Sequence, residues 1–216
     1  MTMTTDHSLI QKLATMLSLQ DTMNSTVDAD WREHDRAWFR AIWIECAELM
    51  EHYGAWKWWR RTEPDLDQVM LEIVDIWHFG LSLHLGHEHD RDRAAAALAA
   101  QWRVPLAATD FHDAVEQLAL RALRQREFLV GAVPVLLEHL GRDFDDLYRA
   151  YVGKNVLNIF RQDHGYRRGD YRKLWHGRED NVHLVEILRL LDADDPDFER
   201  AIYAALAERY ARADPA

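Results

Sequence analysis

Two pairs of acidic residues lie inside stretches of the sequence that are otherwise apolar. Glu45 and Glu48 occur in AIWIECAELM, and Glu72 and Asp75 occur in VMLEIVDIWHFGLSL. A separation of three residues places both members of each pair on one face of a helix. Burying an ionised carboxylate without a partner is costly, and neither stretch carries a nearby basic residue to pair with these acids. Since only residues 54–64 separate the two stretches, we expect antiparallel helices that bring the four carboxylates together.

Converging carboxylates repel one another, and a divalent cation resolves that repulsion. Because all the donors are oxygen atoms, the pattern favours Mg²⁺, Mn²⁺ or Ca²⁺ over Zn²⁺. The alternative is a pair of amphipathic helices whose acids face water. A single acidic pair of this kind is common, but two pairs within apolar helices favour the metal site.

Two other kinds of metal site fit the sequence less well. Di-iron bundles use Glu-x-x-His on paired helices, whereas here only Asp75 and His78 have a comparable spacing. His78 is therefore interpreted as a contact to a ligand or as a satisfied core group. The HEHD stretch at 87–90 suggests a metal-dependent phosphohydrolase, but the other His and Asp residues of such a site have no clear arrangement.

Apolar periodicity and capping residues predict helices along the whole chain, and the few glycines and prolines favour helices over strands. Asp35, Asp65 and Asp110 are the expected N-caps. Gly54 and Gly131 are the expected stops. The expected helices cover 7–23, 35–53, 65–85, part of 87–109, 110–131, 133–140, 143–162, 181–191 and 196–211, with a glycine-punctuated loop at 163–180. No convincing strand is found, so the fold class is all-α, a multi-helix bundle in a single domain over 1–216.

Composition and charge limit the classes of function. A net charge of −11 argues against binding a nucleic acid polymer, yet residues 149–178 contain eight Lys/Arg and two Asp/Glu. A local basic segment in an acidic protein indicates a small anionic ligand, and the alternative is a solvated surface patch. The single cysteine fits a reducing compartment, and no secretory signal or membrane-spanning run is found. We therefore expect a cytoplasmic protein without a membrane partner.

The order of these motifs resembles the dimeric dUTPase family, which belongs to the all-α NTP pyrophosphatases. The two acidic pairs, with GAWKWWR between them, carry the resemblance, together with Gln20 and Asn24 near the N-terminus and GKNVLNIFRQDHGYRRGDYRKLWHGREDN at 153–181. The resemblance covers about 9–85 and 148–190. The segment of about 87–145 is not diagnostic and is interpreted as a variable helical insert.

The resemblance implies a role for each matching position and a homodimer. The four acids would hold Mg²⁺, with Mn²⁺ as a substitute, and Glu48 or Glu45 would accept the proton of the attacking water. Gln20 and Asn24 would read the edge of uracil. The base and deoxyribose pocket would include Trp56, His78 and Phe79. The phosphates, the sugar or the metal shell would be contacted by Lys57, Lys154, Asn155, Asn158, Arg161, Tyr166 and Lys173.

The residue types agree with that chemistry. A side-chain amide offers a donor and an acceptor in one plane, which matches the N–H of uracil between two carbonyls. The expected reaction is hydrolysis of dUTP, and of dUDP, to dUMP, with attack on the α-phosphorus and release of pyrophosphate from dUTP. The alternatives are a (d)NTP pyrophosphohydrolase of broader specificity and a non-catalytic helical regulatory protein. A decayed member should have lost some of the acids, and all four are present.

Overall fold

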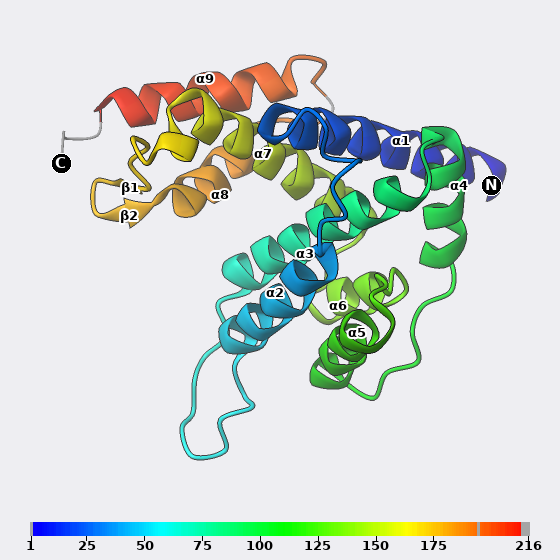
Figure 1. Cartoon of the computed structure of the whole chain (residues 1–216). Helices are drawn as coiled ribbons and strands as arrows, with labels where there is room; N and C mark the ends of the chain where they lie inside the picture. Colours follow the sequence, from blue (N-terminus) through cyan, green and yellow to red (C-terminus); the bar gives the residue numbers. More distant parts are fainter. Residues whose placement is uncertain (1, 194, 213–216) are drawn as a thin grey trace. The chain divides into compact units, whose positions relative to one another are not determined.

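The computed structural model describes residues 2–193 and 195–212, and helices dominate this part of the chain (Figure 1). The helices are α1 Thr2–Val27, α2 Trp38–Tyr53, α3 Leu66–His87, α4 Arg91–Trp102, α5 Phe111–Gln125, α6 Ala132–His139, α7 Phe144–Asp163, α8 Asp180–Leu190 and α9 Phe198–Arg212. Between α7 and α8 lie a short 3₁₀ helix, η1 Tyr166–Arg168, and the strands β1 Leu174–Trp175 and β2 Arg178–Glu179. The prediction of an all-α fold is confirmed. Within the described residues, none of the helices has the length and apolar character needed to cross a bilayer.

The chain divides into two compact units, residues 1–148 and 149–216, with the boundary inside α7. Each unit has its own set of buried apolar side chains. The prediction of a single domain over 1–216 stays a prediction.

In the first unit, α2 and α3 form an antiparallel pair joined by a long loop, and α3 is the central helix (Figure 1). α3 is apolar on nearly all sides and is buried over most of its length, because α1, α2, α4 and α6 all pack against it. α5 covers another face of α2. The hydrophobic burial of these faces therefore fixes α2 and α3 side by side, as the sequence predicted.

Capping side chains set several of the helix starts. Asp65 and Asp110 each accept a hydrogen bond from the backbone N–H three residues later, and Gly54 ends α2 with a φ of +72°. These three predicted boundaries are confirmed. Asp90, the last residue of the HEHD stretch, accepts bonds from two backbone N–H groups and begins α4. The HEHD stretch therefore contains a helix cap.

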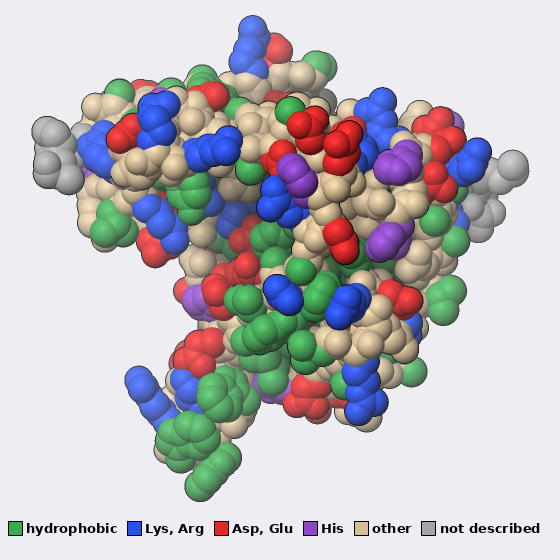
Figure 2. Space-filling model, viewed as in Figure 1, with side chains coloured by type: hydrophobic (Ala, Val, Ile, Leu, Met, Phe, Trp, Pro, Cys, Tyr) green, Lys and Arg blue, Asp and Glu red, His purple; other side chains and the backbone are tan. Residues whose placement is uncertain are grey.

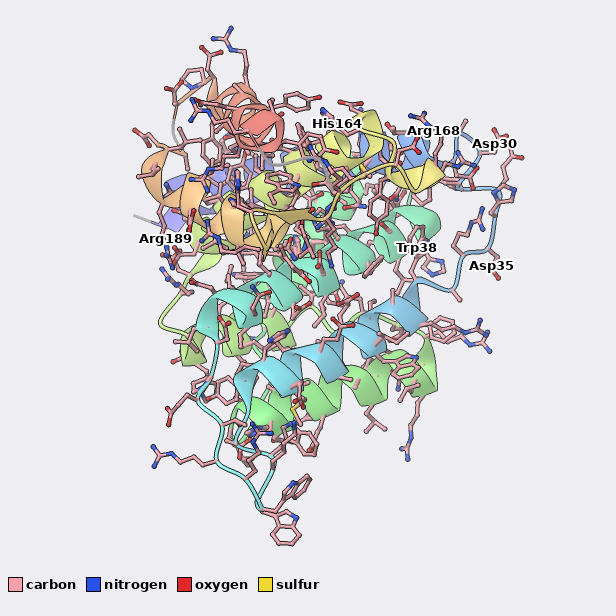
Figure 3. All side chains as sticks on the ribbon, turned by 90° about the vertical axis from the view of Figure 1, so that its left-hand side faces the viewer. Asp30, Asp35, Trp38, His164, Arg168 and Arg189 are labelled. Carbon is pink, nitrogen blue, oxygen red and sulfur yellow. The ribbon has the colours of Figure 1, made fainter. Side chains whose placement is uncertain are left out.

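The predicted start of α2 at Asp35 is wrong. The helix begins at Trp38, and the residue before it makes no side-chain capping bond. Asp35 is exposed and points away from the helix (Figure 3). In the preceding segment, a salt bridge of 2.6 Å joins Arg36 to Asp28 and closes the turn of residues 28–36.

The predicted stop of α5 at Gly131 is also wrong. α5 ends at Gln125 because Arg126 adopts a left-handed conformation with a φ of +58°. Gly131 instead allows a close approach between two segments: a Cβ atom there would lie 2.4 Å from the carbonyl oxygen of Val104. In contrast, α1 continues to Val27 instead of ending near residue 23, so that Asn24 belongs to the same helix as Gln20.

The second unit contains the later part of α7 with α8 and α9, and a two-stranded hairpin that the sequence did not predict. β1 and β2 are antiparallel, with Leu174 opposite Glu179 and Trp175 opposite Arg178. His176 and Gly177 form the turn, both with positive φ, as a tight two-residue hairpin requires. The hairpin fixes Trp175, which is fully buried.

We predict that replacing Gly80 by alanine destabilises the first unit. A Cβ atom at this position of α3 would lie 2.3 Å from the ring of the buried Phe128, so the ring or the helix must shift. Gly80→Ala should lower the free energy of unfolding by about 1–3 kcal/mol in urea denaturation.

Gly86→Ala on the same helix is the matched control, because no atom beyond its own stretch of helix lies within 4 Å of the new Cβ. It should raise stability by about 0.5–1 kcal/mol through its higher helix propensity. Equal effects of the two substitutions would contradict the proposed packing of Phe128 on α3.

Candidate functional site

An acidic cluster lies between α2 and α3. Glu45 of α2 and Glu72 and Asp75 of α3 each place one carboxylate oxygen so that the three atoms lie within 4.8 Å of one another. Glu72 is only 7% exposed, and the other two are half-buried. The antiparallel packing of the two helices therefore brings together three of the four acids singled out in the sequence.

Burial and like charges change the acidity of Glu45. Burial is the largest cause, followed by the charges of Asp75, Glu72 and Glu48, and together they raise the pKa of Glu45 from 4.5 to about 8. At neutral pH the carboxyl of Glu45 therefore retains its proton unless a positive charge is added to the cluster.

Glu48 is exposed at the edge of the acidic cluster and is not one of the three clustered ligands. It is close enough to Glu45 for its charge to raise the pKa of that residue. α2 is not buried on all sides, since Ile44 and Ala47 are also exposed. The α2 surface that carries Glu48 is thus open to a ligand.

His52 is a residue of the cluster that the sequence analysis missed. Its Nε2 atom lies 3.5 Å from Oε1 of Glu72, which corrects the conclusion that no nearby basic residue pairs with these acids. The spacing contained a signal, because residues 45, 48 and 52 recur at i, i+3 and i+7 on one helical face.

A second, polar cluster joins α1 to α3. The Nε2 group of Gln20 donates to Oδ1 of Asn24 over 2.9 Å, and Nδ1 of His78 lies 2.7 Å from Oε1 of Gln20. Nδ2 of Asn24 donates to the hydroxyl of Ser82 over 3.1 Å. All four residues are buried, and Ser82 was not singled out in the sequence. Gln20, Asn24 and His78 were predicted for one pocket, and the structure brings them together.

An aromatic pair lies next to this polar cluster along α3. The ring of Phe79 stacks on that of Trp38, with centroids 6.2 Å apart and planes at 29°. Trp38 stands at the start of α2 beside α3 (Figure 3). The sequence predicted a pocket role for Phe79 but did not identify Trp38. Both side chains are partly exposed.

The loop after α2 holds the two other residues predicted for the pocket and the phosphates. Trp56 is partly exposed and contacts Trp59 edge to face, while Lys57 pairs with Glu51 and lies over the ring of Trp56. Trp58 is 89% exposed, and apolar side chains gather over this loop in Figure 2. Trp56 and Lys57 therefore contact each other and the end of α2, and not the polar cluster of Gln20 and His78.

In the second unit, the predicted phosphate-side residues form a network along α7. Nη1 of Arg161 donates to Asn158 over 3.1 Å, and Nζ of Lys154 donates to Asn181 over 3.2 Å. Lys154, Asn158 and Arg161 recur at i, i+4 and i+7, so that one face of α7 carries them. Asn155, also predicted, is buried.

Asp180 organises this network and was not identified from the sequence. Its carboxylate is fully buried and accepts bonds of 2.8 Å from both Nε and Nη2 of Arg161, and another of 2.8 Å from the hydroxyl of Tyr171. Burial raises the pKa of Asp180, but the hydrogen bonds and charge of Arg161 outweigh burial, and the net pKa is lowered. Asp180 therefore stays ionised and fixes the guanidinium plane of Arg161.

The remaining predicted residues lie on the surface of the second unit. Tyr166 is half-exposed in η1, and the guanidinium of Arg161 lies 5.9 Å from its ring centre. Lys173 is exposed and pairs with Glu179 across the hairpin at 3.3 Å. Tyr166 and Lys173 are thus both open to solvent.

Comparison with known families decides between the classes of function that this geometry allows. The family model described as dUTPase matches residues 12–166, which is most of the chain. The chain belongs to the dUTPase family. It is accordingly a dUTP diphosphatase, with a nucleotide as its substrate. A comparison with curated proteins gives no significant match.

The dUTPase match spans more of the chain than the motifs alone. It contains the four acids, both amides of the polar cluster and the first part of the basic segment, and it also contains the middle segment that was not diagnostic by itself. The non-catalytic reading is not supported, since the family is enzymatic. Lys173 and Asp180 lie beyond the matched residues.

We predict that the metal-free chain loses stability as the pH rises. The folded state keeps a proton on Glu45 up to about pH 8, whereas the unfolded chain releases it near its ordinary value of 4.5. Between these values the folded state binds more protons, so the free energy of unfolding falls with increasing pH. Urea unfolding in a chelator should show this slope, and Glu45→Gln should reduce it.

The control for this prediction is Glu63→Gln, which alters an exposed acid paired with Arg61. Its pH slope should equal that of the parent chain. If Glu45→Gln and Glu63→Gln retain the same slope, Glu45 does not hold a proton in the folded state, and the description of the cluster is wrong.

Proposed function

We propose that this enzyme hydrolyses dUTP, and also dUDP, to dUMP, with Mg²⁺ bound at the acidic cluster and water attacking the α-phosphorus. The observation that supports the proposal best is the convergence of Glu45, Glu72 and Asp75, whose ligand oxygens lie within 4.8 Å of one another. Membership of the dUTPase family provides the substrate class. Mn²⁺ is the expected substitute for Mg²⁺.

The residues of the cluster fit a hard divalent cation. Every donor is a carboxylate oxygen, which is the ligand type that Mg²⁺ and Mn²⁺ prefer. Burial and the charges of the neighbouring acids raise the pKa of Glu45, and a dication bound among these oxygens would favour the ionised form of all three. Glu45, Glu72 and Asp75 would hold the ion, and Glu48 would complete the site from its exposed edge. When bound, the cation would neutralise phosphate charge and favour ionisation of water.

Glu48 is the general base in our proposal, with Glu45 as the alternative. Glu48 stands at the open edge of the cluster, where its carboxylate is accessible to solvent. A base must reach the proton that it removes, and this position meets that requirement better than the half-buried Glu45. The proton of the attacking water would pass to an oxygen atom of Glu48.

The polar cluster of α1 and α3 is proposed to read uracil. Gln20, Asn24 and His78 are buried and supply donors and acceptors on neighbouring turns. Cytosine exchanges donor and acceptor at two positions of its edge and would leave buried groups unpaired, at about 1–3 kcal/mol each. Phe79, stacked on Trp38, is proposed to pack against the deoxyribose and to exclude a ribose hydroxyl.

The phosphates are proposed to bind the basic side chains predicted from the sequence. Arg161 is held in one orientation by Asp180, which suits a planar group that recognises phosphate oxygens. The other members of this proposed set are Lys57, Lys154, Asn155, Asn158, Tyr166 and Lys173. Their charges and amides would offset the negative charge of the triphosphate.

We predict that Glu72→Gln lowers turnover of dUTP by about 100-fold or more, because it removes a buried ligand from the cation site. Turnover should require Mg²⁺, and ³¹P NMR should detect dUMP and pyrophosphate as products. Glu63→Gln, an exposed acid outside the cluster, should keep full turnover. Full turnover of Glu72→Gln would remove the acidic cluster from the mechanism.

The same assay distinguishes the second candidate function, a pyrophosphohydrolase of broader specificity. Rates with dUTP, dUDP, dCTP and dTTP should differ strongly in favour of the two uracil nucleotides. Comparable rates on all four nucleotides would reject uracil specificity while leaving the metal site intact.

We also propose that the chain forms a homodimer. Apolar side chains exposed on the first unit, including Ile44, Trp58, Trp59 and Leu66, provide surface for a second copy. One chain has a mass of 25.4 kDa. The mass measured in solution by light scattering should be twice that of one chain. A monomer mass at every concentration tested would reject the dimer.

A further inference from the structure

Ser82 links Asn24 to the backbone of α3 in the polar cluster of α1 and α3. It is fully buried one helical turn after His78, and its hydroxyl donates to the backbone carbonyl of His78 over 3.0 Å. The same hydroxyl accepts a bond of 3.1 Å from Nδ2 of Asn24. A hydroxyl has one proton to donate. Because Ser82 donates it to the carbonyl of His78, Asn24 must turn its Nδ2 group, and not its Oδ1 atom, toward this hydroxyl.

The bonds of this cluster form a continuous series. Nδ1 of His78 meets Oε1 of Gln20 at 2.7 Å, and Nε2 of Gln20 donates to Oδ1 of Asn24 over 2.9 Å. Each side-chain amide has a donor at one end and an acceptor at the other, so turning one amide forces the next to turn. The series can thus run from His78 to Ser82 or in the reverse direction.

The bond from Ser82 to the backbone favours one direction. In the direction described, four bonds form: His78 to Gln20, Gln20 to Asn24, Asn24 to Ser82, and Ser82 to the carbonyl of His78. In the reverse direction, Oδ1 of Asn24 faces Ser82 and must accept the proton of its hydroxyl. The hydroxyl can then no longer donate to the carbonyl of His78, so that bond is lost. Without the hydroxyl, the two directions have equal numbers of bonds within the series.

We propose that Ser82 is a positioning residue that sets the preference for uracil over cytosine by fixing the amide orientation of Asn24 and Gln20. The proposal rests on the proposed reading of uracil by these two amides. Uracil and cytosine differ by exchange of donor and acceptor on the pairing edge. A turned amide presents that same exchange, so loss of the Ser82 hydroxyl lets the site accept cytosine.

The test compares three substitutions by the ratio of kcat/KM for dUTP to that for dCTP with Mg²⁺. Ser82→Ala should lower this ratio about tenfold, which corresponds to the free-energy contribution of one buried hydrogen bond. Ser82→Cys keeps the volume with a poor donor and should behave like Ser82→Ala. Ser82→Thr keeps the hydroxyl and should retain the ratio. The change should appear mainly in KM for dUTP, with kcat little altered.

A readout without substrate tests the same inference. The described direction requires the proton of neutral His78 to lie on Nδ1, which ¹⁵N chemical shifts of the imidazole report. Ser82→Ala should produce a mixture of the two tautomers. Circular dichroism checks that each variant is folded, and Ser82→Cys serves if Ser82→Ala does not fold.

Asn24→Ala separates failure of this inference from failure of the proposed base reading. If Asn24→Ala leaves the dUTP to dCTP ratio unchanged, both are rejected. If Asn24→Ala lowers the ratio but Ser82→Ala and Ser82→Cys do not, only the role of Ser82 is rejected. An equal loss of activity on both nucleotides in the Ser82 variants would show a purely structural role and would also overturn the proposal.

Discussion

Repulsion between carboxylates held in an apolar helical interior is the constraint on which the first unit depends. α3 is buried because four helices pack against it, so Glu72 cannot turn to water without disturbing that packing. α2 is fixed beside it through buried residues such as Ile42 and Leu49 and brings Glu45 to the same place. Hydrophobic packing of the helix pair thus offsets the repulsion between the acids. That repulsion lowers the stability of the folded first unit.

Much of the fold follows from local sequence signals. The 3.6-residue periodicity and the aspartate caps at 65 and 110 are properties of a few neighbouring residues, and they predicted most of the helices. The failures occurred where distant contacts determine the local structure. Gly131 resembles a helix stop, but its role is to let the chain pass close to Val104. The hairpin at 174–179 has strands of two residues, too short for any alternating pattern.

Site residues could be predicted where a charged residue lies in an apolar segment of the sequence. They could not be predicted where their role depends on a contact with a residue distant in the sequence. Acids in apolar helices stand out in a sequence, and Glu45, Glu72 and Asp75 do converge. Ser82 and His52 are ordinary residues for a helix, and only packing shows what they contact. Asp180 is likewise inconspicuous until Arg161, nineteen residues earlier, is seen to pair with it. The sequence therefore identified charged residues within apolar segments, whereas the structure identified the groups that contact and orient them.

The two units accommodate buried acids in opposite ways. Asp180 receives the guanidinium of Arg161 and the hydroxyl of Tyr171, so its charge is neutralised within the chain. In the acidic cluster, by contrast, three carboxylates from two helices converge on one another, with ligand oxygens within 4.8 Å, and His52 lies 3.5 Å from Glu72. Burial, followed by the charges of the neighbouring acids, raises the pKa of Glu45 there. A dication bound among these oxygens would offset both effects, which is the role that Arg161 already has for Asp180 within the chain.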